Sequence, residues 1–224
     1  MRSTAGRLSG RGITGIVEDT PGITCVPGII ASRAKTLSFV YKIITTDDTQ
    51  YKYDATTVPI PWSSQMYESK QTLRIGYFTS SPVFPAVEVE RTGVLMKCLN
   101  EQKKLREQVL DDMKRLNITL LLAPVYPTPA CKIKDADDII GNLFYAFEWN
   151  VLNLPAGVVP FGTESGTKVE AYNDEGDMFL KLAKQGTESA KGMPIGVQII
   201  GQPFQEEVVL RILTELEDFK NTSS

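Results

Sequence analysis

Two segments of the chain decide its fold: Asn150–Pro160, with the sequence NVLNLPAGVVP, and Gly192–Gly201, with the sequence GMPIGVQIIG. In the second segment Ile195, Val197 and Ile199 alternate with a glycine and a glutamine. Alternation of apolar with other residues is typical of a β-strand that buries one face. We therefore predict a strand within the second segment.

A shorter apolar run, Val158-Val159, lies between Pro155 and Pro160 in the first segment. Because proline has no N–H to donate to a β-ladder, we expect both prolines at the ends of a strand and not inside it. The two segments then predict neighbouring strands joined by a long solvated loop. Gln198 lies on the face opposite to the apolar residues of its strand, where it either bonds backbone in a buried layer or faces water.

The rest of the chain alternates between helical and strand patterns. Apolar residues at helical spacing predict helices, and short apolar or alternating runs predict strands. After the helical pattern that ends at Leu116, we expect Asn117 to act as a left-handed helix stop. The order of these elements is that of an α/β domain. The predicted helices cover 37–44, 85–98, 101–116, 139–149 and 206–219, and the further strands cover 73–78 and 118–123.

The composition is that of a globular protein without histidine. The 224 residues are 42% hydrophobic and 23% charged, and their formal net charge is -3. Because the chain has no excess of Lys and Arg to neutralise phosphates, we do not expect a nucleic-acid binder. The absence of histidine rules out Ser-His-Asp and Cys-His catalysis, and zinc sites that depend on imidazole, within the chain.

Cysteine usage and hydropathy indicate the compartment. Cys25, Cys98 and Cys131 are few, odd in number and far apart, which indicates reduced, intracellular thiols. No apolar run reaches about 18 residues, the length typical of a membrane span, and residues 1–6 lack the apolar core of a secretory signal. We therefore expect an intracellular protein that does not span a membrane, either cytoplasmic or peripherally membrane-associated.

Without histidine, a serine nucleophile in this chain would need another base. A lysine can remove the proton of a serine nucleophile only if its amine is neutral, which requires burial or a neighbouring cation. Glycine-rich backbone must also place N–H groups where the oxyanion develops. The string Gly162–Gly166 looks similar, but it lacks a glycine two residues before Ser165 and lies in a polar stretch, so we predict a turn. No catalytic residue, cofactor or metal site is therefore predicted for this chain.

These motifs together resemble one known family. The pattern Asn150-x-x-x-Leu-Pro-Ala-Gly157, then Gly192-x-Pro-x-Gly-x-Gln-x-x-Gly201, a proline, paired glutamates and an apolar helix resembles the carboxyl-terminal end of the amidase signature family. Within that family the chain is most similar to the fatty acid amide hydrolases, on the proline-bearing linker before Trp62 and the run 73–78.

The resemblance implies an α/β fold, the C-terminal part of the amidase-signature fold, with a mixed, mostly parallel sheet covered by helices. It treats residues 1–224 as one partial domain in three blocks, 7–46, 54–98 and 101–219. The blocks imply an internal deletion near 98–100 and the absence of the N-terminal catalytic part.

The resemblance also implies a reaction. In the family a triad of Ser, cis-Ser and Lys hydrolyses an amide, and in the fatty acid amide hydrolases the products are a fatty acid and an amine. Because the triad and the Gly/Ser-rich signature are not found in this chain, we expect a truncated fragment that is inactive alone. Two alternatives stay open: a non-catalytic partner or pseudoenzyme associating with a full-length amidase, and an active amidase that uses a residual Ser and Lys.

By position in the family, Phe144, Phe147 and Val151 are implied to bind substrate, as part of an apolar groove for a long acyl chain. The same aromatic pattern, which includes Trp149, also fits a helix that only packs in the core. The implied partner is a fatty acid amide substrate in the complete family protein, and no nucleic acid is expected. Peripheral association with a membrane and a homo-oligomer stay open.

Overall fold

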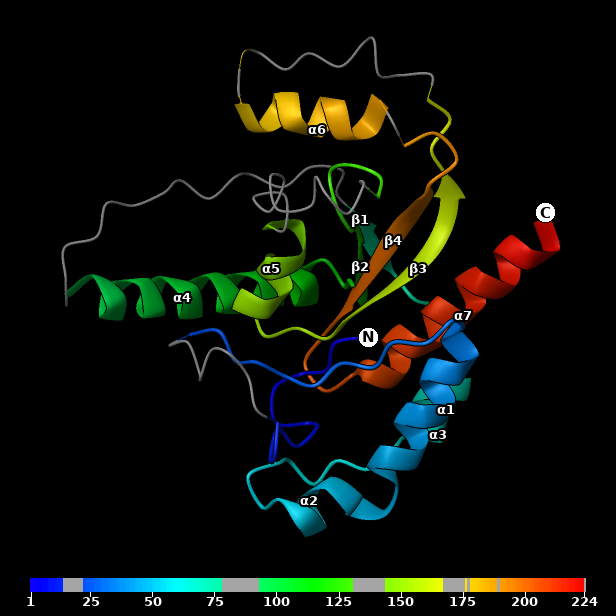
Figure 1. The fold of residues 1–224 in the computed structure, drawn as a ribbon. Helices are drawn as coiled ribbons and strands as arrows, with labels where there is room; N and C mark the ends of the chain where they lie inside the picture. Colours follow the sequence, from blue (N-terminus) through cyan, green and yellow to red (C-terminus); the bar gives the residue numbers. More distant parts are fainter. Residues whose placement is uncertain are drawn as a thin grey trace.

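A four-stranded sheet organises the chain in a computed structural model (Figure 1). The pairing of β1 with β2 is parallel, whereas β4 pairs antiparallel with both β2 and β3. The α/β class and the mixed sheet predicted from the sequence are thus confirmed, and the parallel part is smaller in these strands than expected. The strand order is β1-β2-β4-β3, with β1 at Ile75–Tyr77, β2 at Leu120–Pro124, β4 at Pro194–Gly201 and β3 at Ala156–Thr163.

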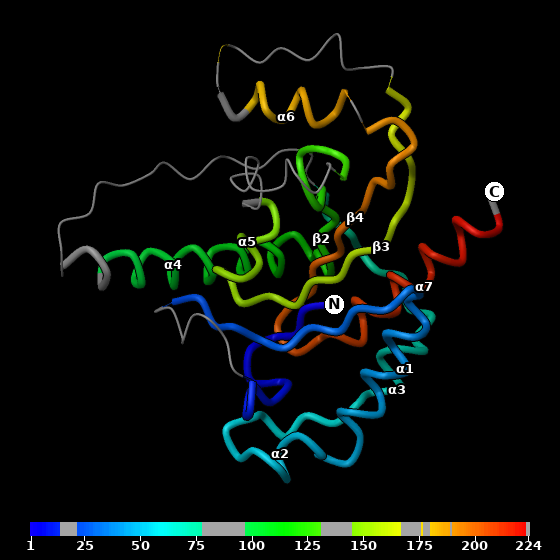
Figure 2. The backbone as a smooth tube through the Cα atoms, viewed as in Figure 1, coloured from blue at the N-terminus to red at the C-terminus, as the bar shows by residue number. Residues whose placement is uncertain are grey.

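Helices cover both faces of the sheet (Figures 1 and 2). α4 and α5 lie on one face and α7 on the other, while α1 and α3 pack on the outer side of α7. The helices are α1 (Ala34–Thr45), α2 (Thr49–Tyr53), α3 (Ser64–Glu68), α4 (Gly93–Arg115), α5 (Phe144–Val151), α6 (Met178–Glu188), α7 (Glu206–Ser223) and a 3-10 turn at Thr46–Asp48. The structure describes residues 1–13, 22–77, 93–130, 144–166, 176, 178–188 and 190–223.

Two apolar cores lie on opposite faces of the sheet because its strands alternate. Leu120, Val159 and Ile199 point to the α7 face and pack on that helix, which forms the α7-side core. One residue further along its strand, Ile200 points the other way and joins the α5-side core. The α7-side core also contains Ala34, Val208, Val209, Ile212 and Leu213, and the α5-side core contains Ala123, Trp149, Leu152, Leu154 and Ala156.

The two predicted strands are confirmed as neighbours, with corrections to their ends and their connection. Pro160 lies inside β3, opposite Gly196, and not at its end. β3 is the outer strand of the sheet, and its register shifts between Pro160 and Gly162, which is where a strand tolerates proline. The predicted long loop to β4 also proved wrong in its described part, because it contains α6.

The helices predicted at 85–98 and 101–116 form one continuous helix, α4, in their described part. No glycine or proline lies between Cys98 and Glu101, so nothing in the sequence ends a helix there. Residues 85–92 lie outside the described part of the chain. Asn117 has a φ of 53°, which confirms the left-handed stop after α4. The internal deletion near 98–100 stays a prediction.

A buried ion network joins the two ends of the described chain. Arg7 contacts Glu206 at 2.8 Å (Nη1–Oε2) and Glu207 at 2.6 Å (Nη2–Oε1), and these side chains are 0% or 1% exposed. The backbone N–H of Thr4 donates to Glu206 at 2.7 Å, and that of Ser63 donates to Glu207 at 3.0 Å. The network therefore fixes the N-terminal segment and the linker before α3 to the first turn of α7.

Replacing Arg7 tests how much this network contributes. We expect Arg7→Leu to lower the free energy of unfolding by about 3–5 kcal/mol, because two buried carboxylates lose their cation. Urea denaturation followed by circular dichroism measures the change. Lys35→Leu is the matched control, because the Lys35–Asp218 pair is 62% and 51% exposed and its loss should leave the midpoint nearly unchanged.

A triple variant separates the ion pairing from the volume of the side chains. Arg7→Leu combined with Glu206→Gln and Glu207→Gln removes the charges together and keeps acceptors for the two backbone N–H groups. We expect it to regain most of the stability lost in Arg7→Leu. An Arg7→Leu variant as stable as the parent would contradict the role of the network.

A second polar tie holds the loop before α3 to the N-terminal segment. Ser9 donates to Asp54 over 2.5 Å, and Thr56 donates through its hydroxyl and its backbone N–H over 2.6 and 3.0 Å. The hydrogen bond from Ser9, followed by those from Thr56, lowers the pKa of Asp54 to about 2. The ionised carboxylate is therefore the form that this tie stabilises.

The stability from Asp54 should depend on pH. The folded-state pKa of about 2 lies below the ordinary value of about 3.9, so the contribution is present above about pH 4 and is lost as pH falls through about 2. We expect the difference in unfolding free energy between the parent and Asp54→Asn to be constant near neutral pH and to disappear in that acid range. Ser9→Ala should move this loss to higher pH, and a pH-independent difference would refute the assignment.

Candidate substrate-binding site

A cavity of about 480 Å³ lies between α5, the β3 edge of the sheet and two N-terminal segments, residues 1–2 and 26–30. Ala146, Trp149 and Asn150 line it from α5, at the i, i+3 and i+4 spacing of one helix face. Val158 and Gln198 line it from β3 and β4. A volume of this size is within the range of about 300–1,000 Å³ found for small-molecule sites.

The residues predicted to bind substrate all belong to α5, and the structure places two of their side chains. Phe147 is 44% exposed and Val151 is half-buried. Both lie on a face of α5 adjacent to the one that lines the cavity, so the cavity and the predicted acyl-chain wall are separate surfaces. Phe144 begins α5, and its side chain lies outside the described part of the chain. Their role in substrate binding stays a prediction.

Trp149 belongs to the core. It is 3% exposed and packs in the α5-side core with Leu152 and Leu154. Trp149 thus packs in the core and also lines the cavity, and the choice between the two roles given in the sequence analysis stays open. α4 fixes the position of the helix: Gln102 donates to the carbonyl of Val151 at 2.6 Å, and Arg106 donates to the carbonyl of Leu152 at 2.8 Å.

The Asn150–Ala156 stretch binds the N-terminal segment through Arg2. The guanidinium donates to Oδ1 of Asn150 at 2.5 Å and to the carbonyl of Leu154 at 2.8 Å. The backbone of Arg2 pairs with Ala156 in both directions, at 2.7 and 3.1 Å. Burial lowers the pKa of Arg2 to about 10, so it stays protonated at neutral pH. We call these contacts the Arg2 clamp. The sequence did not predict it, because nothing in the sequence shows which cation binds Asn150 and Asn153.

Asn153 forms a left-handed turn next to the Arg2 clamp. Its φ is 50°, a left-handed conformation that asparagine tolerates better than most residues. From this turn its Oδ1 accepts the N–H of Ala5 at 2.9 Å. The same Oδ1 accepts Nη2 of Arg2 at 3.5 Å, so the second asparagine of the motif is explained by backbone geometry and by two hydrogen bonds to the N-terminal segment.

Gln198 is buried in the wall of the cavity. It is 4% exposed, and its Oε1 has no hydrogen-bond partner among the described residues. Of the two alternatives for Gln198, the buried one is confirmed. Oε1 accepts no hydrogen bond from a described backbone N–H, so the expected bond to backbone is not found at this atom. A buried acceptor without a partner costs free energy, so it marks this part of the cavity as one that suits a donor.

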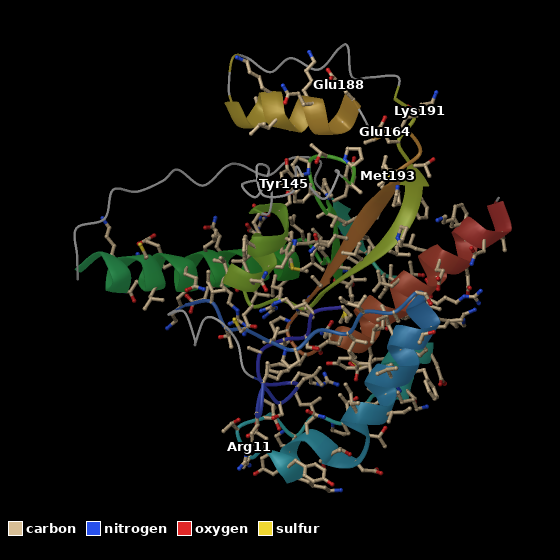
Figure 3. All side chains as sticks on the ribbon, in the orientation of Figure 1. Arg11, Tyr145, Glu164, Glu188, Lys191 and Met193 are labelled. Atoms are coloured by element: carbon tan, nitrogen blue, oxygen red, sulfur yellow. The ribbon has the colours of Figure 1, made fainter. Side chains whose placement is uncertain are left out.

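The described residues do not assemble a serine nucleophile with a neutral lysine. Every described lysine has an exposed or half-buried side chain, so burial does not favour the neutral amine. The turn predicted at Gly162–Gly166 is wrong in its first half, because Gly162 and Thr163 still pair with β4 as part of β3. The chain bends after them: the carboxylate of Glu164 accepts the N–H of Gly166 at 2.7 Å, and Gly166 has a φ of 76°. Figure 3 shows Glu164 beside Lys191 and Met193 at the open ends of β3 and β4. This bend follows the end of β3 and begins the connection to β4 that contains α6.

The described part of the chain has neither a metal-binding cluster nor a helix that could span a membrane. No group of three His, Cys, Asp or Glu side chains there is placed to hold a metal ion. None of the described helices has the length and apolar character needed to cross a bilayer. Cys25 and Cys98 are free and exposed, and Cys131 lies outside the described residues.

Comparison with known proteins identifies one family. The model of the amidase family matches residues 87–210. The chain is 31% identical to fatty acid amide hydrolase 1 from Caenorhabditis elegans over 158 residues, which are 64% of this chain and 27% of that protein. It is 30% identical to fatty-acid amide hydrolase 1 from Sus scrofa over 129 residues, 56% of this chain and 22% of that protein.

A solved structure of a fatty acid amide hydrolase has the same fold. Its TM-score is 0.78 at 16% sequence identity, and the match covers 98% of this chain and 52% of that one. The chain spans only about a quarter of the length of the curated relatives, 27% and 22%. The fold predicted from the sequence, part of the amidase-signature fold, is therefore confirmed.

Substitutions at Asn153 should separate its two contributions. We expect Asn153→Ala to lower the free energy of unfolding by about 2–3 kcal/mol, because it loses the hydrogen bonds from Ala5 and Arg2 and forces alanine into a left-handed conformation. Asn153→Gly should recover about 1 kcal/mol of this, since glycine adopts that conformation without strain. Urea denaturation of both variants checks the order, and equal stabilities would contradict the backbone argument.

Proposed function

Because the chain belongs to the amidase family, we propose that it forms part of a serine amidase of the fatty acid amide hydrolase type. The reaction of that enzyme is hydrolysis of a fatty acid amide to a fatty acid and an amine. The proposal is supported by the two fatty acid amide hydrolases that are 31% and 30% identical to the chain. The shared fold is consistent with it.

Within this enzyme the 224 residues supply scaffold and a wall for the acyl chain, and not the groups that attack the amide. The observation that carries this division is the exposure of the lysines: none of those in the described part is buried, and without histidine the chain needs a neutral lysine as base. Phe147, exposed on α5, offers apolar surface to an acyl chain, with Phe144 and Val151 as its neighbours on that helix.

A second candidate function is that of a non-catalytic partner of a full-length amidase. The observation that favours it is the outer edge of β3, where Val158 is 43% exposed beside the cavity and Ile30 is 97% exposed on its opposite wall. Apolar side chains beside an unpaired strand edge are typical of an interface.

The compartment that we propose is intracellular. Cys25 and Cys98 are free thiols on the surface, which suits a reducing environment. A fatty acid amide partitions into membranes, so peripheral contact of the complete enzyme with a lipid surface fits the proposed substrate.

The proposal predicts that the chain binds a fatty acid amide without hydrolysing it. Incubation of the 224-residue protein with an oleoyl amide that releases a fluorescent amine should give no more product than heat-denatured protein. A fluorophosphonate should label no serine, with a known serine hydrolase as positive control. Labelling or turnover above these levels would establish a residual active site and contradict the division of roles.

Binding is measured with the same amide by calorimetry. We expect Phe147→Ala to weaken it by about tenfold, because burying a phenylalanine side chain contributes about 1.5 kcal/mol or more. Phe39→Ala is the matched control, since Phe39 is an exposed phenylalanine on α1, far from α5 in sequence. Equal effects of the two substitutions would remove Phe147 from the acyl-chain wall.

A further inference from the structure

A smaller pocket lies between α1 and the segment 62–68 that contains α3, two helices that both pack on the outer side of α7 (Figure 1). Its volume is about 180 Å³, below the range of about 300–1,000 Å³ for drug-sized ligands, so its occupant is a small molecule or the head of a larger one. The pocket combines aromatic rings with charges of both signs: Phe39, Trp62 and Tyr67 with Lys35, Lys42 and Glu68.

Trp62 is the fixed part of the pocket. Its backbone N–H donates to the carbonyl of Thr45 at 3.1 Å, and its indole N–H donates to Oγ of Ser64 at 3.1 Å. The ring of Tyr67 is tilted by 52° against that of Trp62, with 5.2 Å between the centroids. Phe39, on α1, is 64% exposed at the same pocket. Because the face of an aromatic ring attracts a cation, and quaternary ammonium groups are typical ligands of such rings, this lining suits a cationic group.

Lys42 lies at one end of the pocket. It belongs to the last turn of α1, the helix whose final residue, Thr45, bonds Trp62. Its ammonium forms no ion pair or hydrogen bond with a described residue. Lys35 lies seven residues earlier, about 10 Å along the helix axis, and its ammonium is held by Asp218 at 2.8 Å. Lys42 is therefore the lysine of the pocket whose charge is available to an anion.

Glu68 lies at the other end of the pocket. The hydroxyl of Tyr67, its neighbour in α3, contacts that of Thr214 at 3.2 Å. Thr214 lies one turn before Asp218 on α7, which holds Lys35 at the start of α1, so the end of α3 lies toward the start of α1. The carboxylate of Glu68 also has no partner among the described residues. The pocket thus offers an unpaired cation at one end, an unpaired anion at the other and aromatic rings between them.

We propose that this pocket binds a zwitterion of the phosphocholine type, with its phosphate at Lys42 and its quaternary ammonium between the aromatic rings and Glu68. A simple anion leaves Glu68 unpaired and a simple cation leaves Lys42 unpaired, whereas a zwitterion pairs with both. An α-amino acid separates its charges by a single carbon, while the ester oxygen and ethylene group of phosphocholine give the longer reach that the two ends require. The proposal goes beyond the amidase role and does not depend on which amide is hydrolysed.

Proton–nitrogen NMR of the full 224-residue chain tests the pocket directly, because Trp62 and Trp149 give one indole signal each. Trp149 packs in the α5-side core, on the other face of the sheet, and is the internal control; Trp62→Phe assigns the signals. We expect phosphocholine to shift the Trp62 signal in a saturable way and to leave the Trp149 signal in place. At equal ionic strength, choline alone and inorganic phosphate alone should bind at least about tenfold more weakly, because each leaves one charged end unpaired.

Substitutions at the two ends test the assignment of each charge. Lys42 and Glu68 are exposed, so Lys42→Gln and Glu68→Gln should fold with a nearly unchanged Tm. We expect each to weaken phosphocholine binding by about tenfold. Lys42→Gln should not weaken choline, and Glu68→Gln should not weaken phosphate, which tells the two ends apart. Lys114→Gln is the matched control, because Lys114 is an exposed lysine of α4, on the opposite face of the sheet from α1.

Vesicles distinguish the source of the zwitterion. Phosphatidylcholine vesicles that sediment the protein, with release by free phosphocholine, would assign the pocket to a lipid headgroup. Phosphocholine binding without sedimentation would assign it to the free molecule, and both results support the site. An unmoved Trp62 signal would overturn the proposal, as would inorganic phosphate that binds as tightly as phosphocholine, or binding that both substitutions leave unchanged. None of these measurements involves amide turnover, so failure of this proposal is distinct from failure of the proposed function.

Discussion

One arginine held between two carboxylates in a solvent-free site is the constraint on which the structure depends. Arg7 cannot be buried without Glu206 and Glu207, and they cannot be buried without it, because an isolated charge in the interior costs far more free energy than a domain has to spare. The contacts therefore form together or not at all. Since they involve the first ten residues and the first turn of α7, the chain can bury them only when its two ends meet.

The ion network and the Arg2 clamp act on the same short segment in sequence. Arg7 fixes the far end of the segment to α7, and Arg2 fixes its near end to Asn150 and to the edge of β3. α7 packs on one face of the sheet, and α5, which carries Asn150, covers the other. The segment thus ties the two helical layers across the edge of the sheet. Arg2, which makes one end of this tie, also lines the cavity between α5 and the β3 edge.

Local patterns were enough to predict most of the elements, and long-range contacts account for what they missed. The alternation in 195–199 and the left-handed Asn117 are encoded within a few residues, so both were predicted correctly. Pro160 inside β3 could not be predicted, because the sequence does not show that β3 is an outer strand. Arg7 begins the first of the three blocks that resemble the family, but its partners lie about two hundred residues away, a separation that no periodicity reveals.

The candidate site differs from the fold in how far the sequence could define it. Phe147 and Val151 were named from the resemblance alone, whereas the cavity depends on which face of α5 meets Arg2, a tertiary fact. Neither surface places a neutral lysine among the described residues, since the buried cations of the network and the clamp are arginines, which do not deprotonate near neutral pH. A chain that uses its buried charge to hold two layers together has, in its described part, structural cations and no general base. The buried acceptor without a partner in the cavity wall, Oε1 of Gln198, belongs to an amide, which accepts a hydrogen bond but does not act as a general base.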